Sequence, residues 1–344
     1  MRSRHSASAP RAGRRAQAGP WRPSALTIII AVLGIAGLTA GLYPMSAAWL
    51  TSYNQSKVLR TSVAALDDLR PTADEQLALA AAYNEALSAG VVLGKNAHVP
   101  VGEWTLADQT LEYTELLNGG AKGLMSRVKI PSIDVDLPVY HGTSDAVLER
   151  GAGHLEGSHL PIGGIGTRAV LTAHRGLANA TMFTNLDRVA VGDTFTVETL
   201  GQVLSYRVRD TQVIDPEDTG TLRPETGADL VTLVTCTPLG INTHRILVTG
   251  ERITPTPARD LREAGAVSDV PGFPWWIMLA GGGFALVVIY VVRQGFAEGA
   301  ARARGGAPRP AEPVATPGPP ASAASPEPRD PAGAAEAGQA LQSR

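Results

Sequence analysis

The sequence predicts a mainly β domain, a closed barrel or a sandwich, held between two membrane-spanning helices. Two observations carry this prediction. Seven short runs rich in β-branched residues follow one another between residues 126 and 253, with Gly, Pro and Asp at the breaks. Two apolar stretches of about 19 residues flank that region, and each is long enough to cross a bilayer. The expected strands cover residues 126–130, 135–140, 169–173, 194–199, 204–214, 230–236 and 246–253.

The charges around the two apolar stretches predict their orientation. Residues 1–24 contain six Arg and no acidic residue, and Arg293, Arg302 and Arg304 follow the second stretch. The positive-inside rule therefore places both termini in the cytoplasm and residues 44–273 outside the cell membrane. A cleaved signal peptide is the alternative for the first stretch, because residues 44–48 (PMSAA) loosely resemble a cleavage site.

The remaining segments differ in amino-acid composition. Pro71 is expected to interrupt helical structure. Thr72 and Glu75 fit a capping box at the start of an Ala/Leu-rich helix. The tail from residue 305 onward holds nine Pro in 40 residues, a composition that predicts disorder. The expected division is a cytoplasmic basic N-terminus (1–24), a span (25–43), a helical arm with a possible lid (44–120), a β-barrel (121–256), a linker (257–273), a span (274–292) and a cytoplasmic tail (293–344).

Composition excludes several functions. The formal net charge of −2 provides no basic field, so nucleic acid is not an expected partner. The single cysteine, Cys236, leaves no possibility of an intramolecular disulfide. Three histidines, His141, His154 and His159, have spacings that match no standard metal site, so no metal is expected.

Cys236 is the first candidate for chemistry, because it ends the run LVTLVTC and precedes Thr-Pro, which cannot continue a central strand. His174 also stands at a strand exit, in AVLTAHRG, and is a candidate base for the thiol. Arg245 follows Cys236 by nine residues, a spacing that suits a strand–loop–strand return and an oxyanion contact. A buried cysteine and a surface arginine are the alternative interpretations.

Three segments together resemble the sortases, and specifically the class C, or pilin-polymerising, sortases. They are IPSIDVDLPVYHGTSDAVLERGAGHLEGSHLPIGG (130–164), AVLTAHRGLANATMFTNLDRVAVGDTF (169–195) and DLVTLVTCTPLGINTHRILVTGERI (229–253). The resemblance covers roughly residues 110–255, and the TLVTC and CTPxGxNxHR strings are its most specific parts. It implies a closed eight-stranded antiparallel-type barrel, with the helical arm and the two spans fitting class C.

The resemblance also implies roles for particular residues. Cys236, His174 and Arg245 match the family's catalytic positions, and Thr235, Thr237 and His244 are expected to line the substrate groove. Ala173 replaces the Gly that usually precedes the catalytic His. The family's Asp-Pro-aromatic lid motif is missing from residues 102–118, where Trp104 and Asp108 are the candidates for a lid.

The implied activity is a cysteine transpeptidase of the membrane surface. It cleaves an LPxTG-like sorting signal of a secreted protein between Thr and Gly through a thioester, and passes the acyl group to an amine. In class C that amine is a pilin Lys, and the exchange of one amide for another requires no cofactor. Alternatives are a housekeeping sortase that uses cell-wall peptide, an L,D-transpeptidase, and a non-catalytic membrane-anchored β module that only binds.

Overall fold

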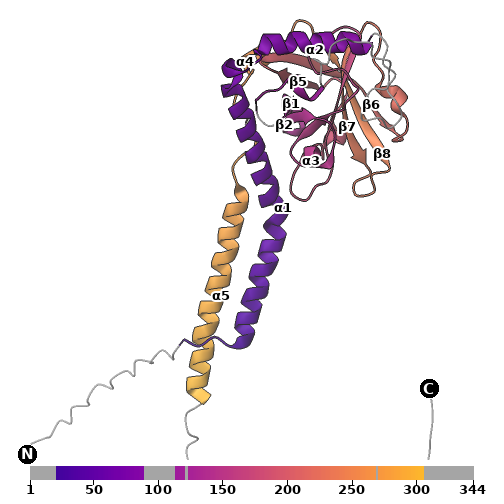
Figure 1. Cartoon of the computed structure of the whole chain (residues 1–344). Coiled ribbons are helices and arrows are strands. Elements are labelled where there is room, and N and C mark those ends of the chain that lie inside the picture. Colours follow the sequence, from indigo (N-terminus) through magenta and orange to yellow (C-terminus); the bar gives the residue numbers. More distant parts are fainter. Residues whose placement is uncertain (1–20, 89–112, 121–122, 269, 306–344) are drawn as a thin grey trace, which may run out of the picture. The chain divides into compact units, whose positions relative to one another are not determined.

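Residues 21–88, 113–120, 123–268 and 270–305 are described by the computed structural model (Figure 1). Eight strands close into a barrel in the order β1-β2-β3-β4-β7-β8-β6-β5, which confirms the expected mainly β class and the closed barrel. The strands are β1 (Leu124–Ile130), β2 (Val135–His141), β3 (Ala152–His154), β4 (Thr167–Thr172), β5 (Thr194–Thr199), β6 (Gln202–Ile214), β7 (Asp229–Thr237) and β8 (His244–Arg252).

The barrel differs from the expectation in two ways. Strand β3 has no counterpart among the expected strands, because three residues are too few to show an alternating pattern. It pairs with β2 in parallel and with β4 in antiparallel orientation. Strands β4 and β7 are also parallel. The other six strand pairs are antiparallel, so the expected antiparallel-type barrel needs correction only at these two pairs.

The inner face of the barrel holds the main hydrophobic core. Side chains alternate along each strand, so that Leu171, Leu233 and Val248 point inward and are buried. Phe195 and Tyr206 stack with ring centroids 5.5 Å apart. A Cβ atom at Gly250 would collide with the Phe195 ring, so only glycine fits beneath this pair.

Two helices form the arm that precedes the barrel. Helix α1 (Ala25–Ala64) runs unbroken through Pro44, well past residue 43, where the first span was expected to end. Helix α2 (Ala73–Ser88) begins with the expected capping box: the Thr72 amide donates to Glu75 Oε2 at 2.9 Å, and the Glu75 amide donates to Thr72 Oγ1 at 3.4 Å. Short helices are η1 (Leu66–Asp68), η2 (Tyr113–Glu115), η3 (Pro131–Ile133), α3 (Asp145–Leu148), η4 (Leu186–Arg188), η5 (Thr219–Leu222) and α4 (Ala258–Arg262).

Both arm helices are bound to the barrel domain by polar side chains. In α1, Thr51 Oγ1 donates to the Asn179 carbonyl at 2.8 Å, and Gln55 Nε2 donates to the Arg150 carbonyl at 3.1 Å. In α2, Asn84 makes a pair of bonds with the backbone of Leu160, at 3.0 and 2.7 Å. An amide side chain that satisfies both backbone groups of one residue fixes register as well as distance.

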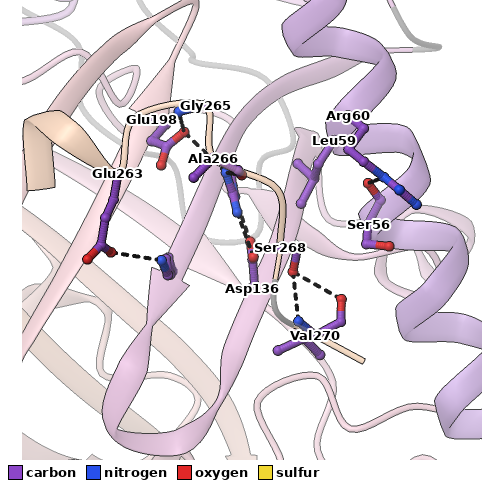
Figure 2. A network of polar contacts seen from close by, with 12 residues as sticks. Ser56, Leu59, Arg60, Asp136, Glu198, Glu263, Gly265, Ala266, Ser268 and Val270 are labelled. Atoms are coloured by element: carbon purple, nitrogen blue, oxygen red, sulfur yellow. Dashed lines mark hydrogen bonds and ion pairs between the residues drawn. The ribbon is translucent and has the colours of Figure 1, made fainter. Parts of the chain in front are cut away.

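The expected linker covered residues 257–273. Its first part, residues 257–268, folds back along the barrel and is called the strap here (Figure 2). Arg127 forms a buried bidentate pair with Asp136, with both N···O distances 2.6 Å, and also donates to the Ala266 carbonyl at 3.0 Å. Glu198 accepts from the Gly265 amide at 3.2 Å. The strap is thus held by charged groups from β1, β2 and β5.

Beyond the strap, helix α5 (Trp275–Gly305) begins close to α1. Trp49 Nε1 donates to the Gly272 carbonyl at 2.8 Å, and the rings of Trp49 and Trp276 lie 6.3 Å apart. By length and composition, α1 and residues 275–302 of α5 could each cross a membrane. Residues 23–295 form one compact unit, and every contact described here lies within it.

Candidate active site

Three neighbouring strands bring the candidate catalytic residues to one edge of the barrel. Strands β4 and β7 run parallel and pair Thr172 with Val234, and β7 pairs Cys236 with Arg245 of the antiparallel β8. His174 and Cys236 each lie two residues beyond the matched pair. Since both strands run in the same direction, equal offsets place His174 beside Cys236. The strand register thus pairs Cys236 with Arg245 and puts His174 at the matching offset beyond β4.

The candidate site lies on the outer face of the barrel. Val170, Val234 and Leu247 form a small cluster separate from the main core. By strand alternation, Cys236 and Arg245 point to the same side as this cluster. Cys236, His174 and Arg245 are all partly buried. The Cys236 thiol is therefore partly exposed, and the apolar cluster packs beneath the strands that carry it.

Backbone contacts continue the sheet for a short distance beyond β4. The Ala173 amide donates to the Val234 carbonyl at 3.2 Å. Thr235 Oγ1 donates to the Ala173 carbonyl at 2.8 Å, and Thr235 is only 1% exposed. The His174 carbonyl accepts from the Phe183 amide at 3.0 Å. Thr235, predicted for the substrate groove, thus holds the strand that carries His174.

Arg245 is fixed at one end of its guanidinium. Its Nη1 donates to the carbonyls of Asn242 and His244, at 2.9 and 3.0 Å. Within the described part of the chain, Nε and Nη2 of Arg245, the His174 ring and the Cys236 thiol form no hydrogen bond. None of the described residues occupies these polar atoms. Together the three side chains offer a nucleophile, a proton carrier and a cation at one edge.

The other predicted groove and lid residues have different surroundings. Thr237 Oγ1 accepts from Arg175 at 2.9 Å. The His244 ring bonds to Thr243 Oγ1 at 2.9 Å and lies 3.4 Å from an oxygen of Asp215. The lid candidates Trp104 and Asp108 lie outside the described residues.

The three histidines that were considered for metal binding join the arm to the barrel. Nδ1 of His141 is 3.0 Å from the Gly123 carbonyl oxygen, and Nε2 is 2.6 Å from that of Leu116. The fully buried His154 contacts the Tyr113 hydroxyl at 3.0 Å, and His159 contacts Ser88 at 2.8 Å. Among the described residues, no three His, Cys, Asp or Glu side chains are arranged to hold a metal ion.

Burial controls the protonation of this histidine cluster. Loss of hydration lowers the pKa of His154 to about 4 and also lowers the pKa of His159. A neutral His154 with a proton on Nε2 donates to the His159 carbonyl at 2.8 Å and accepts from Tyr113 at Nδ1. The lowered pKa values keep His154 and His159 uncharged at neutral pH.

Arg175 is the residue near the site that the sequence reading missed. It directly follows His174, and its guanidinium contacts the residue that follows Cys236. Its place beside His174 was the only sequence signal. That signal is weak, because the partners of Arg175 lie 9 to 62 residues away along the chain.

Comparisons with known proteins agree with this geometry. The Sortase domain family matches residues 128–253, from β1 to the end of β8. Over 139 residues the chain is 28% identical to Sortase D of Bacillus subtilis (strain 168), which covers 40% of this chain and 66% of that protein. Over 127 residues it is 27% identical to Sortase A of Streptococcus agalactiae serotype III (strain NEM316), covering 36% and 51%. The chain thus matches less than two thirds of the length of either protein.

Solved structures match over nearly their whole length. The type III crystal structure of Streptococcus agalactiae Sortase C1 is 39% identical, with a TM-score of 0.51, and the match covers 60% of this chain and 98% of that one. Sortase C of Streptococcus pneumoniae is 37% identical, with a TM-score of 0.50, covering 58% and 98%. Both matches thus combine an identity well above 30% with coverage of nearly the whole solved chain. The chain therefore belongs to the sortase family of transpeptidase enzymes.

Proposed function

We propose that this sortase is a membrane-anchored cysteine transpeptidase that joins pilin subunits. Cys236 is the nucleophile, His174 the general acid and base, and Arg245 the group that stabilises the oxyanion. The observation that carries the proposal is the pairing of Cys236 with Arg245 across β7 and β8, with His174 at the matching offset beyond β4. No other cysteine is present in the chain.

The first half of the reaction forms a thioester. The Cys236 thiol passes its proton to His174, and the sulfur attacks the Thr carbonyl carbon of an LPxTG-like signal. The negative charge that develops on the carbonyl oxygen is stabilised by the Nε and Nη2 donors of Arg245. The Thr–Gly bond then breaks as His174 donates a proton to the departing Gly amine. The thioester and a shortened peptide with a free amino terminus are the products.

The second half reverses the roles. His174 removes a proton from an incoming amine, which attacks the thioester carbonyl and releases the Cys236 thiol. One amide is broken and one is formed, so the exchange needs no external energy source. We propose a Lys side chain of a pilin as the acceptor, because the chain is similar to sortase C enzymes over their whole length and the Streptococcus pneumoniae structure was described with pilin substrates in view.

Membrane anchoring places the proposed enzyme and its substrate on the same surface. With α1 and α5 as spans and both termini in the cytoplasm, the barrel lies on the outer side, where a membrane-anchored sorting signal also lies. Restricting enzyme and substrate to one surface raises the effective concentration of the signal.

The test is a covalent trap. The full chain in lipid nanodiscs is mixed with an LPETG peptide and examined by intact mass spectrometry. We expect an adduct with the mass of the peptide truncated after Thr, removed by hydroxylamine and absent in Cys236→Ala. His174→Ala and Arg245→Ala should lower the rate of adduct formation by at least about a hundredfold.

Competition between acceptors then identifies the amine. A pilin-derived peptide with one Lys and a cell-wall peptide with a free amino group are offered together to the thioester. Transfer to Lys supports pilin assembly, whereas transfer to the wall peptide indicates a housekeeping sortase. Binding of the peptide without any adduct, unchanged in Cys236→Ala, would point to a non-catalytic module.

A further inference from the structure

Arg175 connects the two strand ends that carry His174 and Cys236. It directly follows His174, and its Nη1 donates to the hydroxyl of Thr237 at 2.9 Å. Thr237 directly follows Cys236 in β7. The hydrogen bond thus joins the residue after His174 to the residue after Cys236.

The other nitrogens of the Arg175 guanidinium are anchored as well. Nε donates to the Thr184 carbonyl at 3.1 Å, and Nη2 forms an ion pair with Asp187 at 2.8 Å. The Arg175 side chain is only 12% exposed. All three nitrogens therefore have different partners, and the planar guanidinium has little freedom to move. Arg175 therefore fixes the position of Thr237 relative to Thr184 and Asp187.

A close packing contact accompanies this hydrogen bond. Gly176 adopts a positive φ of 77°, and a Cβ atom there would lie 2.5 Å from Cδ1 of Leu239. The turn after His174 therefore presses directly against the loop between β7 and β8. We call the contacts Arg175–Thr237 and Gly176–Leu239 the latch.

The latch lies where the sheet no longer determines geometry. The ladder between β4 and β7 ends at Thr172, two residues before His174. The His174 ring forms no hydrogen bond to a described residue that would fix its direction. Its position relative to the Cys236 thiol therefore depends on the backbone. Beyond Ala173 that backbone is held by the latch together with the hydrogen bond from the Phe183 amide to the His174 carbonyl.

We propose that Arg175 is a positioning residue, which keeps the His174 ring and the Cys236 thiol in register for proton transfer. This inference rests on the proposed roles of Cys236 and His174. Proton transfer requires the two heavy atoms to lie within hydrogen-bond reach, and a displacement of about 1 Å is enough to lower a rate a hundredfold. Arg175 acts through Thr237 and need not touch the substrate.

Thr237 provides the matched variants for the test. Thr237→Val keeps the shape of the side chain and removes the acceptor, whereas Thr237→Ser keeps the hydroxyl. In full-length enzyme in nanodiscs, with LPETG peptide and a Lys acceptor, we expect Thr237→Val to lower kcat about tenfold with KM within twofold of the wild type. Thr237→Ser should retain at least half of kcat, and Arg175→Lys should resemble Thr237→Val.

The double variant decides whether the two residues act as one device. If Thr237 works through Arg175, then Arg175→Lys combined with Thr237→Val should be no slower than Arg175→Lys alone. Losses that multiply would overturn the proposal, and so would wild-type kcat in Thr237→Val. A rise in KM alone would instead assign Thr237 to substrate binding.

A second readout does not depend on catalysis. The Phe183 amide, which donates to the His174 carbonyl, should exchange with deuterium at least about tenfold faster in Arg175→Lys and in Thr237→Val, while amides within β7 remain unchanged. If the wild type forms no thioester, the proposed function fails, but this exchange still decides whether the latch holds the turn. Unchanged exchange at Phe183, or a general acceleration across the barrel, would overturn the inference.

Discussion

At the scale of single residues, the buried histidine cluster has the clearest dependence on pH. His154 is completely buried, and burial lowers its pKa from 6.5 to about 4. The unfolded chain takes up a proton near pH 6.5, which the folded protein does not accept until about pH 4. Stability is therefore unaffected by His154 titration above pH 6.5. As the pH falls from 6.5 to 4, the free energy of unfolding decreases by about 3 kcal/mol.

The first prediction concerns this loss of stability at low pH. Urea unfolding of the full-length protein in detergent, followed by circular dichroism of the sheet, should show a free energy of unfolding that declines between pH 6.5 and pH 4. His154→Gln should be less stable at pH 7, because the imidazole contacts with Tyr113 and the His159 carbonyl change, and should show a shallower decline. An equally steep decline in the variant would mean that His154 titrates normally.

Cys236, His174 and Arg245 show what a sequence can establish about single residues. Each stands where a strand ends or begins, and strand ends are recognisable from Pro, Gly and Asp. Arg175 is different, because its importance comes from partners that the chain brings together only on folding. A residue that contacts distant residues has no local pattern.

At the scale of elements, the strap depends on the buried pair of Arg127 and Asp136. Both side chains are at most 6% exposed, and Arg127 also reaches the strap at Ala266. The pair of hydrogen bonds to Asp136 and the nearby negative charges raise the pKa of Arg127 against the opposing effect of burial, so the guanidinium stays charged. A charge left without its partner in this position is costly.

We therefore predict that Asp136→Asn destabilises the protein by about 3–5 kcal/mol in urea unfolding. The ion pair of Lys129 with Glu263, 3.1 Å long but 24% and 40% exposed, provides the matched control. Glu263→Gln should cost less than about 1 kcal/mol, because water screens an exposed pair. Equal losses in the two variants would show that the strap is not anchored by the buried pair.

At the scale of the whole molecule, α1 links the first candidate span to the turn that carries His174. The helix is continuous, and Thr51 bonds to Asn179 in that turn. Thr51 follows residue 43, the expected end of the span, by eight residues, so at 1.5 Å per residue the contact lies about 12 Å beyond it along the helix. If α1 is the proposed membrane anchor, it sets the height of the active site above the bilayer.

Lengthening α1 tests this arrangement. Seven helix-forming residues inserted after Met45, with a flexible insertion of the same length after Phe273, raise the barrel by about 10 Å and nearly preserve the helix phase. Cleavage of a soluble LPETG peptide should stay within twofold of the wild type, whereas transfer from a membrane-anchored substrate should fall at least tenfold. The same heptad inserted before Trp21 is the control, and equal losses with both substrates would contradict the arrangement.

Patterns along the chain are enough to predict the mainly β class, seven of the eight strands, the capping box at Thr72 and the two long apolar helices. These features depend on alternation, capping and apolar length, which are local properties of the chain. The sequence also placed Cys236, His174 and Arg245 at strand ends. What it could not give was how those ends meet.

Three features become visible only in the folded protein: the parallel pairs of β2 with β3 and β4 with β7, the strap formed by residues 257–268, and the latch between Arg175 and Thr237. Each depends on contacts between residues that are far apart along the chain. Strand direction, an ion pair and a side-chain hydrogen bond across strands leave no periodic trace in the sequence, since their energy appears only when the barrel closes.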